Sequence, residues 1–355
     1  MNCTERKFIN YIGNCAFGEK QLKIYNHINY KEINLNEILE LSRLHNVDSI
    51  IYSSLIKENS ISKYSNSKIK YLLNRRETIE LKDKDSLDYF FLITDKFQNY
   101  NIEFIILLGI FEKKLYPSHN HRIINEVEIL IDKKDLNSVK NILSNLDYKF
   151  KYNIDGSNLK FTHDKYYSII VHTSFFKVSS DMSIINKLQK DIWSNSIESS
   201  FINNKLTCLC DEDMLLYLSI NIAKLLKNNN ITILDICDFA LLSTKLIDVL
   251  NWDSFFIKAS ICEVEKLLLS LFIISNQFFN TRIPDEYNIN KIYNKKYINS
   301  LIGKILHPIL PDEIKDEIVI DSLNKNHFKL SLQKLFKRNS ISISTEQILT
   351  WLDLN

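Results

Sequence analysis

The stretch IEFIILLGIFEKKLYPSHNHRIINEVEILID, residues 102–132, decides the fold, because it joins two apolar runs and a pair of carboxylates in one short unit. Its first run, at 105–108, is continuous and rich in isoleucine, which predicts a strand buried on both faces and ended at Gly109. Its second run, EVEILI, begins by alternating acidic and apolar residues, so Glu126 and Glu128 share one face of the expected strand.

Two carboxylates on one face of a strand have two interpretations. If that face is covered, Glu126 and Glu128 repel each other unless a cation lies between them, which makes them a candidate site for Mg²⁺ or Mn²⁺. If the strand lies at an exposed edge, both are solvated side chains. Glu-x-Glu is a weak pattern by itself, so its surroundings have to decide.

The residues around this pair resemble the uncharacterised nucleotidyltransferase family, which has the minimal nucleotidyltransferase fold. The family pattern is Leu-Lys-Gly, then Arg-x-x-x-Asp-x-Asp followed by an apolar strand end. The matching residues in this chain are Leu107, Leu108, Gly109, Arg122, Glu126 and Glu128. The register is kept, but a leucine replaces the lysine and two glutamates replace the aspartates, so the motif is degenerate.

The resemblance implies a role for each matching residue. Glu126 and Glu128 would hold the metal, while Gly109 and Arg122 would bind the phosphates of a nucleoside triphosphate. The family's third carboxylate stands two residues before a histidine, and the matching stretch here is YYSIIVH. Ile170 occupies the carboxylate position, and His172 remains as a substitute ligand or base.

The pattern of elements predicts an α+β protein with a small mixed sheet backed by helices. Helical periodicity covers residues 34–58 and 67–99, strands and one helix follow, and the chain is helical again from Asp211. We expect an N-terminal helical segment at 1–100, a nucleotidyltransferase-like α/β domain at 101–210 with four or five strands, and a C-terminal helical domain at 211–355. The first helices of the last domain are expected to wall the acidic cleft.

Composition indicates which classes of partner and which cellular compartment to expect. The 45 basic and 43 acidic residues leave a net charge of +2, which indicates no nucleic-acid partner. No apolar run approaches the roughly 18 residues of a membrane span, and the N-terminus lacks the apolar core of a signal peptide. The six cysteines form no Cys-x-x-Cys pair. We therefore expect a cytoplasmic protein with reduced cysteines.

Three further groups of residues have both a functional and a structural interpretation. His119 and His121 could recruit a transition metal with Glu126, or could be loop residues without a role. Asp235 and Asp238, one helical turn apart, could bind a base or a metal, or could cap the helix and form a salt bridge. The basic stretch FKLSLQKLFKR near the C-terminus is either a solvated helix face or a contact for an acidic partner.

Two functions follow from the resemblance. The first is metal-dependent transfer of a nucleoside monophosphate from an NTP to an unknown acceptor, which could be a peptide or protein. The second is a pseudoenzyme that binds a nucleotide, peptide or partner protein as an accessory in a biosynthetic pathway. The retained acidic pair and Arg122 favour transfer, and the missing lysine and third carboxylate favour binding.

Overall fold

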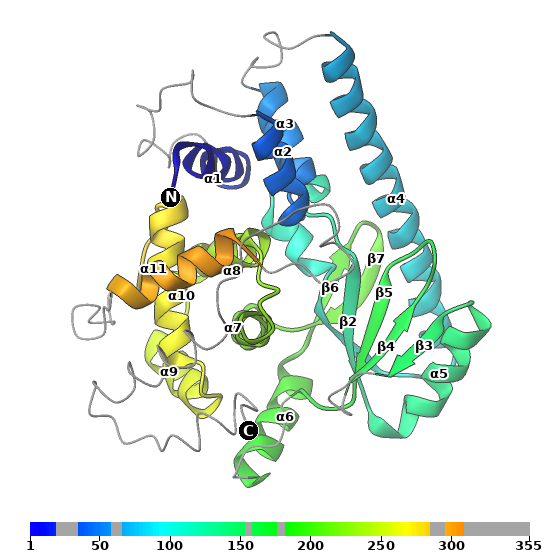
Figure 1. Cartoon of the computed structure of the whole chain (residues 1–355). Helices are drawn as coiled ribbons and strands as arrows, with labels where there is room; N and C mark the ends of the chain where they lie inside the picture. The colour runs from blue at the N-terminus through cyan, green and yellow to red at the C-terminus, as the bar shows by residue number, and fades with distance from the viewer. Residues whose placement is uncertain (19–34, 58–65, 153–157, 176–181, 285–294, 309–355) are drawn as a thin grey trace.

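The computed structural model describes residues 1–18, 35–57, 66–152, 158–175, 182–284 and 295–308. Its architecture is α+β, as predicted, with one mixed sheet between layers of helices (Figure 1). The helices are α1 (Cys3–Ala16), α2 (Leu35–Leu44), α3 (Asp48–Lys57), α4 (Asn66–Asn99), α5 (Leu136–Asn145), α6 (Met182–Asn195), α7 (Asp211–Lys227), α8 (Ile233–Leu246), α9 (Trp252–Ile261), α10 (Glu265–Phe279) and α11 (Lys295–Leu306). None of the described helices is both long and apolar enough to cross a membrane.

The sheet has seven strands in the order β3-β4-β5-β2-β1-β7-β6. They are β1 (Phe104–Leu108), β2 (Glu126–Ile131), β3 (Lys149–Tyr152), β4 (Asn158–Thr162), β5 (Ser168–His172), β6 (Ile197–Phe201) and β7 (Asn204–Cys208). Strand β2 is antiparallel to β1 and parallel to β5, while β7 joins the other side of β1 in parallel. The expected four or five strands were too few, because the β6–β7 hairpin extends the sheet through β1.

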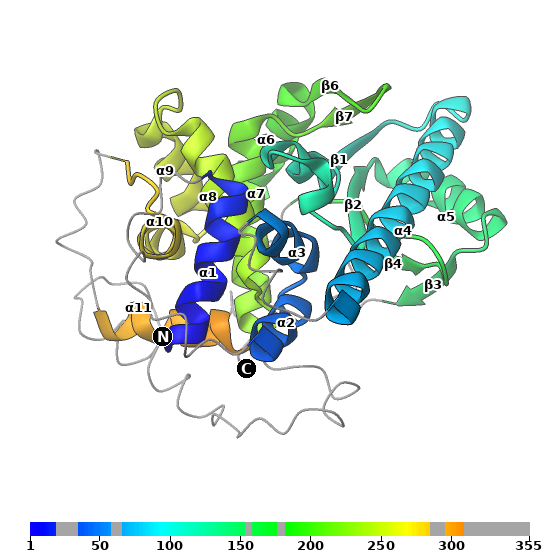
Figure 2. The ribbon, with the colours of Figure 1, turned by 90° about the horizontal axis from the view of Figure 1, so that it is seen from above.

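The two faces of β2 meet different layers of helices. Val127 and Ile129 are fully buried, whereas Glu126 and Glu128 alternate with them and point to the opposite face. Helix α7 approaches the acidic face, and α4 and α5 lie beyond the other face (Figure 2). Glu126 and Glu128 therefore lie on a face partly covered by helices rather than on an edge strand.

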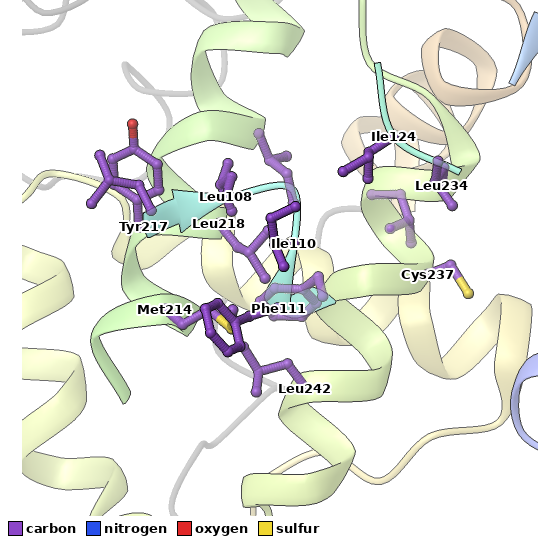
Figure 3. Packing of buried hydrophobic residues seen from close by; sticks show 14 of the residues in the cluster. Leu108, Ile110, Phe111, Ile124, Met214, Tyr217, Leu218, Leu234, Cys237 and Leu242 are labelled. Atoms are coloured by element: carbon purple, nitrogen blue, oxygen red, sulfur yellow. The ribbon is translucent and has the colours of Figure 1, made fainter. Parts of the chain in front are cut away.

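Apolar side chains from α7 and α8 pack around the end of β1. Figure 3 shows Leu108 and Phe111, at and just after the end of β1, beside Met214 and Leu218 of α7. Tyr217 lies at the side of this cluster with its hydroxyl directed away from it. This packing fixes α7 against the sheet and sets the position of the Tyr217 hydroxyl.

The N-terminal helices pack against the C-terminal ones. Helix α1 contacts α3 and α10. His45, which follows α2, is fully buried and its Nδ1 accepts a hydrogen bond from the Ile233 amide at 3.3 Å, at the start of α8. Burial lowers the pKa of His45 to about 4, so the ring is neutral and able to accept. The division into domains at 1–100, 101–210 and 211–355 stays a prediction.

Candidate functional site

Four strands place one row of side chains across the acidic face. Glu128 of β2 pairs in register with Leu108 of β1 on one side and Ile170 of β5 on the other. Ile170 in turn pairs with Lys160 of β4. The predicted alignment of the three central strands is therefore confirmed, and Glu128 has a leucine and an isoleucine as its direct neighbours.

Lys160 reaches across β5 to the first carboxylate. Its ammonium group forms an ion pair with Glu126 Oε1, although β4 and β2 are separated by β5. The two side chains are about one-third exposed, at 33% for Lys160 and 39% for Glu126. A positive charge belonging to the chain therefore binds the carboxylate that was predicted to bind a metal.

The second carboxylate is held by two neutral or basic side chains. His172 Nε2 lies 2.8 Å from Glu128 Oε2, and the Tyr217 hydroxyl donates to the same oxygen at 2.7 Å. Burial would raise the pKa of Glu128, but hydrogen bonds and positive charge from His172, Lys224 and Tyr217 lower it below its ordinary value. Glu128 is therefore ionised, and its Oε2 is already occupied.

Gly109 stands where a side chain has no space. Its φ of +112° is in the left-handed region, and an added Cβ would lie 2.7 Å from the Glu126 carbonyl oxygen. The Gly109 amide donates to both carboxylate oxygens of Glu112, at 2.8 and 2.9 Å. The amide that was predicted to approach a phosphate thus contacts a buried carboxylate of the chain itself.

Arg122 is likewise bound by an internal carboxylate. Its Nη2 lies 2.8 Å from Asp238 Oδ2 on α8, and its Nε lies 2.9 Å from the same oxygen. Tyr116 donates to Asp238 Oδ1 at 2.6 Å. Asp238 is 2% exposed and Arg122 14%. In this structure the Arg122 guanidinium is paired with a residue of α8. Its role in phosphate binding therefore stays a prediction.

The other candidate residues are dispersed. Asp235 accepts from the amide and hydroxyl of Thr232, which is the capping interaction of α8. The His119 ring packs against Phe201, and His121 is buried with its ring nitrogens 3.5 Å from the Cys15 sulfur. The structural interpretation therefore holds for both aspartates, and neither histidine is found with Glu126. The basic stretch FKLSLQKLFKR lies outside the described residues.

Sequence reasoning missed Lys160 and Tyr217. Lys160 alternates with Leu159 and Phe161, which signals that its side chain faces away from the apolar layer. Tyr217 lies within the apolar run of α7, which gave no sign that its hydroxyl reaches a carboxylate. The pairing register that brings both to the carboxylates is a property of the tertiary structure.

The donors on this face do not fit a pair of divalent cations. Mg²⁺ needs oxygen ligands in octahedral geometry, and Ile170 supplies none at the third position. An ion bound to Glu126 would lie close to the Lys160 ammonium, whose positive charge would repel it. Within the described ranges, no group of three or more His, Cys, Asp or Glu side chains is placed to hold a metal. Metal binding by Glu126 and Glu128 stays a prediction that this arrangement disfavours.

Comparisons with known proteins match this chain to one family and to several solved structures. The sequence model of the uncharacterised nucleotidyltransferase family matches residues 31–280. The search among curated proteins found no match. A lincosamide antibiotic adenylyltransferase with bound lincomycin is 17% identical, with a TM-score of 0.32, over 43% of this chain and 94% of its own.

Two further solved structures are similar. The antibiotic-resistance factor ANT(2'')-Ia is 9% identical, with a TM-score of 0.39, over 53% of this chain and 96% of its own. An antigenic nucleotidyltransferase-like protein from Paracoccidioides brasiliensis is 12% identical, with a TM-score of 0.32, over 59% of this chain and 93% of its own. At these TM-scores, the three likenesses carry no argument about fold, activity or substrate.

Proposed function

Because this chain belongs to the uncharacterised nucleotidyltransferase family, we propose that it binds nucleoside triphosphates without metal-dependent transfer, as a catalytically degenerate member. One observation carries the proposal. The Lys160 ammonium binds Glu126 across the position of Ile170, where the family pattern has its third carboxylate. The chain thus places its own cation on the acidic face.

Electrostatics explains why an internal ammonium opposes metal binding. A divalent ion placed near Glu126 would repel Lys160, whose head group is already within ion-pair distance. It would also compete with Tyr217 and His172 for Oε2 of Glu128. The ion would lose protein contacts that Mg²⁺ needs to offset its own dehydration.

The second candidate is slow transfer of a nucleoside monophosphate to an unknown acceptor, such as a peptide, with Mg²⁺ or Mn²⁺. The lowered pKa of Glu128 favours it, because an ionised carboxylate is the form that coordinates a cation. In that case His172 would act as a substitute ligand or base. The two candidates differ in whether metal strengthens nucleotide binding.

Calorimetric titration separates the candidates without knowledge of the acceptor. ATP, GTP, CTP and UTP are titrated into the protein with EDTA, and again with Mg²⁺ or Mn²⁺. We expect at least one nucleotide to bind with an affinity that metal leaves unchanged within about twofold. A nucleotide that binds only with metal would favour the transferase, and the absence of all nucleotide binding would overturn the proposal.

Variants of the acidic face sharpen this experiment. The double variant Lys160→Met and Ile170→Glu removes the internal ammonium and supplies the third carboxylate, so we expect it to gain binding of Mn²⁺. Adding Glu128→Gln should remove that gain. If the unchanged protein instead transfers nucleotides at an ordinary rate of about 1–100 per second, and Glu128→Gln abolishes the transfer, the degenerate assignment is wrong.

A further inference from the structure

A pocket of about 310 Å³ lies beside the N-terminal ends of β2 and β5, where α3 and α4 adjoin the sheet. Asn46, which precedes α3, contributes to its lining, and so do Asn125 before β2 and Tyr166 before β5. Helices α3 and α4 lie side by side next to this part of the sheet (Figures 1 and 2). The volume is at the lower end of the range for small-molecule sites, which is about 300–1,000 Å³.

The pocket is distinct from the acidic face. Its lining includes neither Glu126 nor Glu128, and none of the side chains that contact them. Much of it comes from α4, which lies beyond the face of the sheet opposite to α7 (Figure 2). A ligand in this pocket therefore does not contact the candidate nucleotide site.

Both carboxylates in the pocket lining already have partners. Asp48 accepts hydrogen bonds from the Tyr52 hydroxyl and the Ser42 hydroxyl, each at 3.1 Å. Asp48 therefore has two hydroxyl partners and keeps its negative charge.

Asp83 is bound still more firmly. Lys113 Nζ lies 2.8 Å from its Oδ2, and the two side chains are 1% and 6% exposed. The Tyr167 hydroxyl donates to its Oδ1 at 2.7 Å. This buried pair neutralises Asp83, so the second acid adds little negative charge to the pocket.

The basic side chains of the lining remain available. Arg75 and Lys82 lie seven residues apart on α4, which places them two turns apart on the same face of the helix. Neither side chain has a carboxylate partner within 4.0 Å in the part of the chain that the structure describes. With Asp83 neutralised by Lys113, the lining has two cations, Arg75 and Lys82, against one remaining carboxylate, Asp48, so one positive charge is in excess.

The rest of the pocket offers an apolar surface. Ile79 lies between the two basic residues on α4, and Ile123, in the loop before β2, also lines the pocket. The Tyr166 ring stacks on Tyr89 with ring centroids 3.9 Å apart, which holds it at the pocket wall. A ligand of mixed character thus finds cations and an apolar wall in one small volume.

We propose that this pocket binds an amphipathic organic anion: a small molecule with an aromatic or aliphatic body and one acidic group. The acidic group would pair with Arg75 and Lys82, and the body would lie against Ile79, Ile123 and Tyr166. The amides of Asn46 and Asn125 would add neutral hydrogen bonds at its edge. This site is independent of the proposed nucleotide binding.

A fluorescent probe pair tests the proposal on the full chain. The anion 8-anilinonaphthalene-1-sulfonate is titrated into the protein, and N-phenyl-1-naphthylamine serves as the neutral molecule with the same aromatic body. We expect the sulfonate to bind at one saturable site and the neutral molecule to bind at least fivefold more weakly. Equal binding of the two probes would overturn the requirement for an anion.

Variants of α4 locate the site. Arg75→Gln and Lys82→Gln should each weaken sulfonate binding about two- to fivefold, as expected for a partly exposed ion pair, and the double variant about tenfold. Lys84→Gln removes a charge from the same helix outside the pocket lining and should leave the affinity unchanged. The proposal is wrong if the double variant binds like the unchanged protein, or if Lys84→Gln weakens binding equally. ATP titration of the double variant should match the unchanged protein, which keeps the two proposals separable.

Discussion

Gly109 carries a constraint that no other residue type can meet. Its positive φ and the 2.7 Å approach of a hypothetical Cβ to the Glu126 carbonyl oxygen add backbone strain to a steric clash. We expect Gly109→Ala to destabilise the protein by about 2–4 kcal/mol, measured by urea unfolding. Gly303→Ala is the matched control, because that glycine lies in α11 with nothing within 4 Å of the added carbon. It should stabilise the helix by about 0.5–1 kcal/mol, and an equal loss in both variants would contradict the argument.

Glu112 gives the stability a dependence on pH. Burial raises the pKa of its carboxyl from 4.5 to about 7, even though the nearby Arg122 opposes this rise. The folded protein therefore holds this proton more tightly than the unfolded chain does. The resulting contribution to stability is fully present below about pH 4.5 and is lost as the pH rises through 7. At about 1.4 kcal/mol per pKa unit it amounts to roughly 3 kcal/mol.

The variant Glu112→Gln isolates this effect. Thermal unfolding is followed between pH 5 and pH 8 for both proteins, and the fall in melting temperature across this range should be smaller in the variant, since glutamine has no proton to lose. Parallel profiles for the two proteins would show that Glu112 titrates normally in the folded state.

For single residues, the sequence predicted the strand face that a side chain occupies better than it predicted the ion-pair partner of that side chain. Alternation placed Glu126 and Glu128 on one side of β2, and the structure confirms it. The ion pair from Lys160 could not be predicted, because it crosses β5 and depends on the registers of two strand pairs at once. Arg122 was assigned to a ligand because Asp238, its partner 116 residues away, becomes a neighbour only after α8 docks.

Among the elements, the Arg122–Asp238 pair joins the loop before β2 to α8. Arg122→Met leaves a buried carboxylate without its partner, so we expect a loss of about 3–5 kcal/mol in urea unfolding. The double variant Arg122→Met and Asp238→Leu removes both charges and should lose less than the first change alone. Additive losses in this double-mutant cycle would mean that the two charges do not stabilise each other.

The pattern of elements was largely readable from local periodicity. The helix expected at 67–99 is α4 at Asn66–Asn99, and the helical region expected from Asp211 begins with α7 at Asp211–Lys227. The seven-stranded size of the sheet was not readable, because β7 pairs with β1 from about 100 residues away along the chain. Helix α6 was also missed, although Ile184, Leu188 and Ile192 recur there at helical spacing.

For the whole molecule, the buried side chains form one continuous core that includes α1, the sheet and the C-terminal helices. We therefore expect one cooperative transition in differential scanning calorimetry, with equal calorimetric and van't Hoff enthalpies. Two or three resolved transitions would instead support independent domains at 1–100, 101–210 and 211–355. Cleaving the chain after Cys210 should then release stable pieces, whereas a single core predicts that the pieces aggregate.

The contact of α1 with α10 sets an order of events during synthesis. Phe8, Ile9 and Ile12 of α1 are fully buried in the finished protein, yet α10 begins only at Glu265. At ~5–20 residues per second, the ribosome needs on the order of 10–50 s to deliver α10 after α1 has emerged. Throughout that interval α1 can pack against α3 but not against α10, so we expect the nascent chain to expose the part of the α1 apolar face that α10 covers in the finished protein.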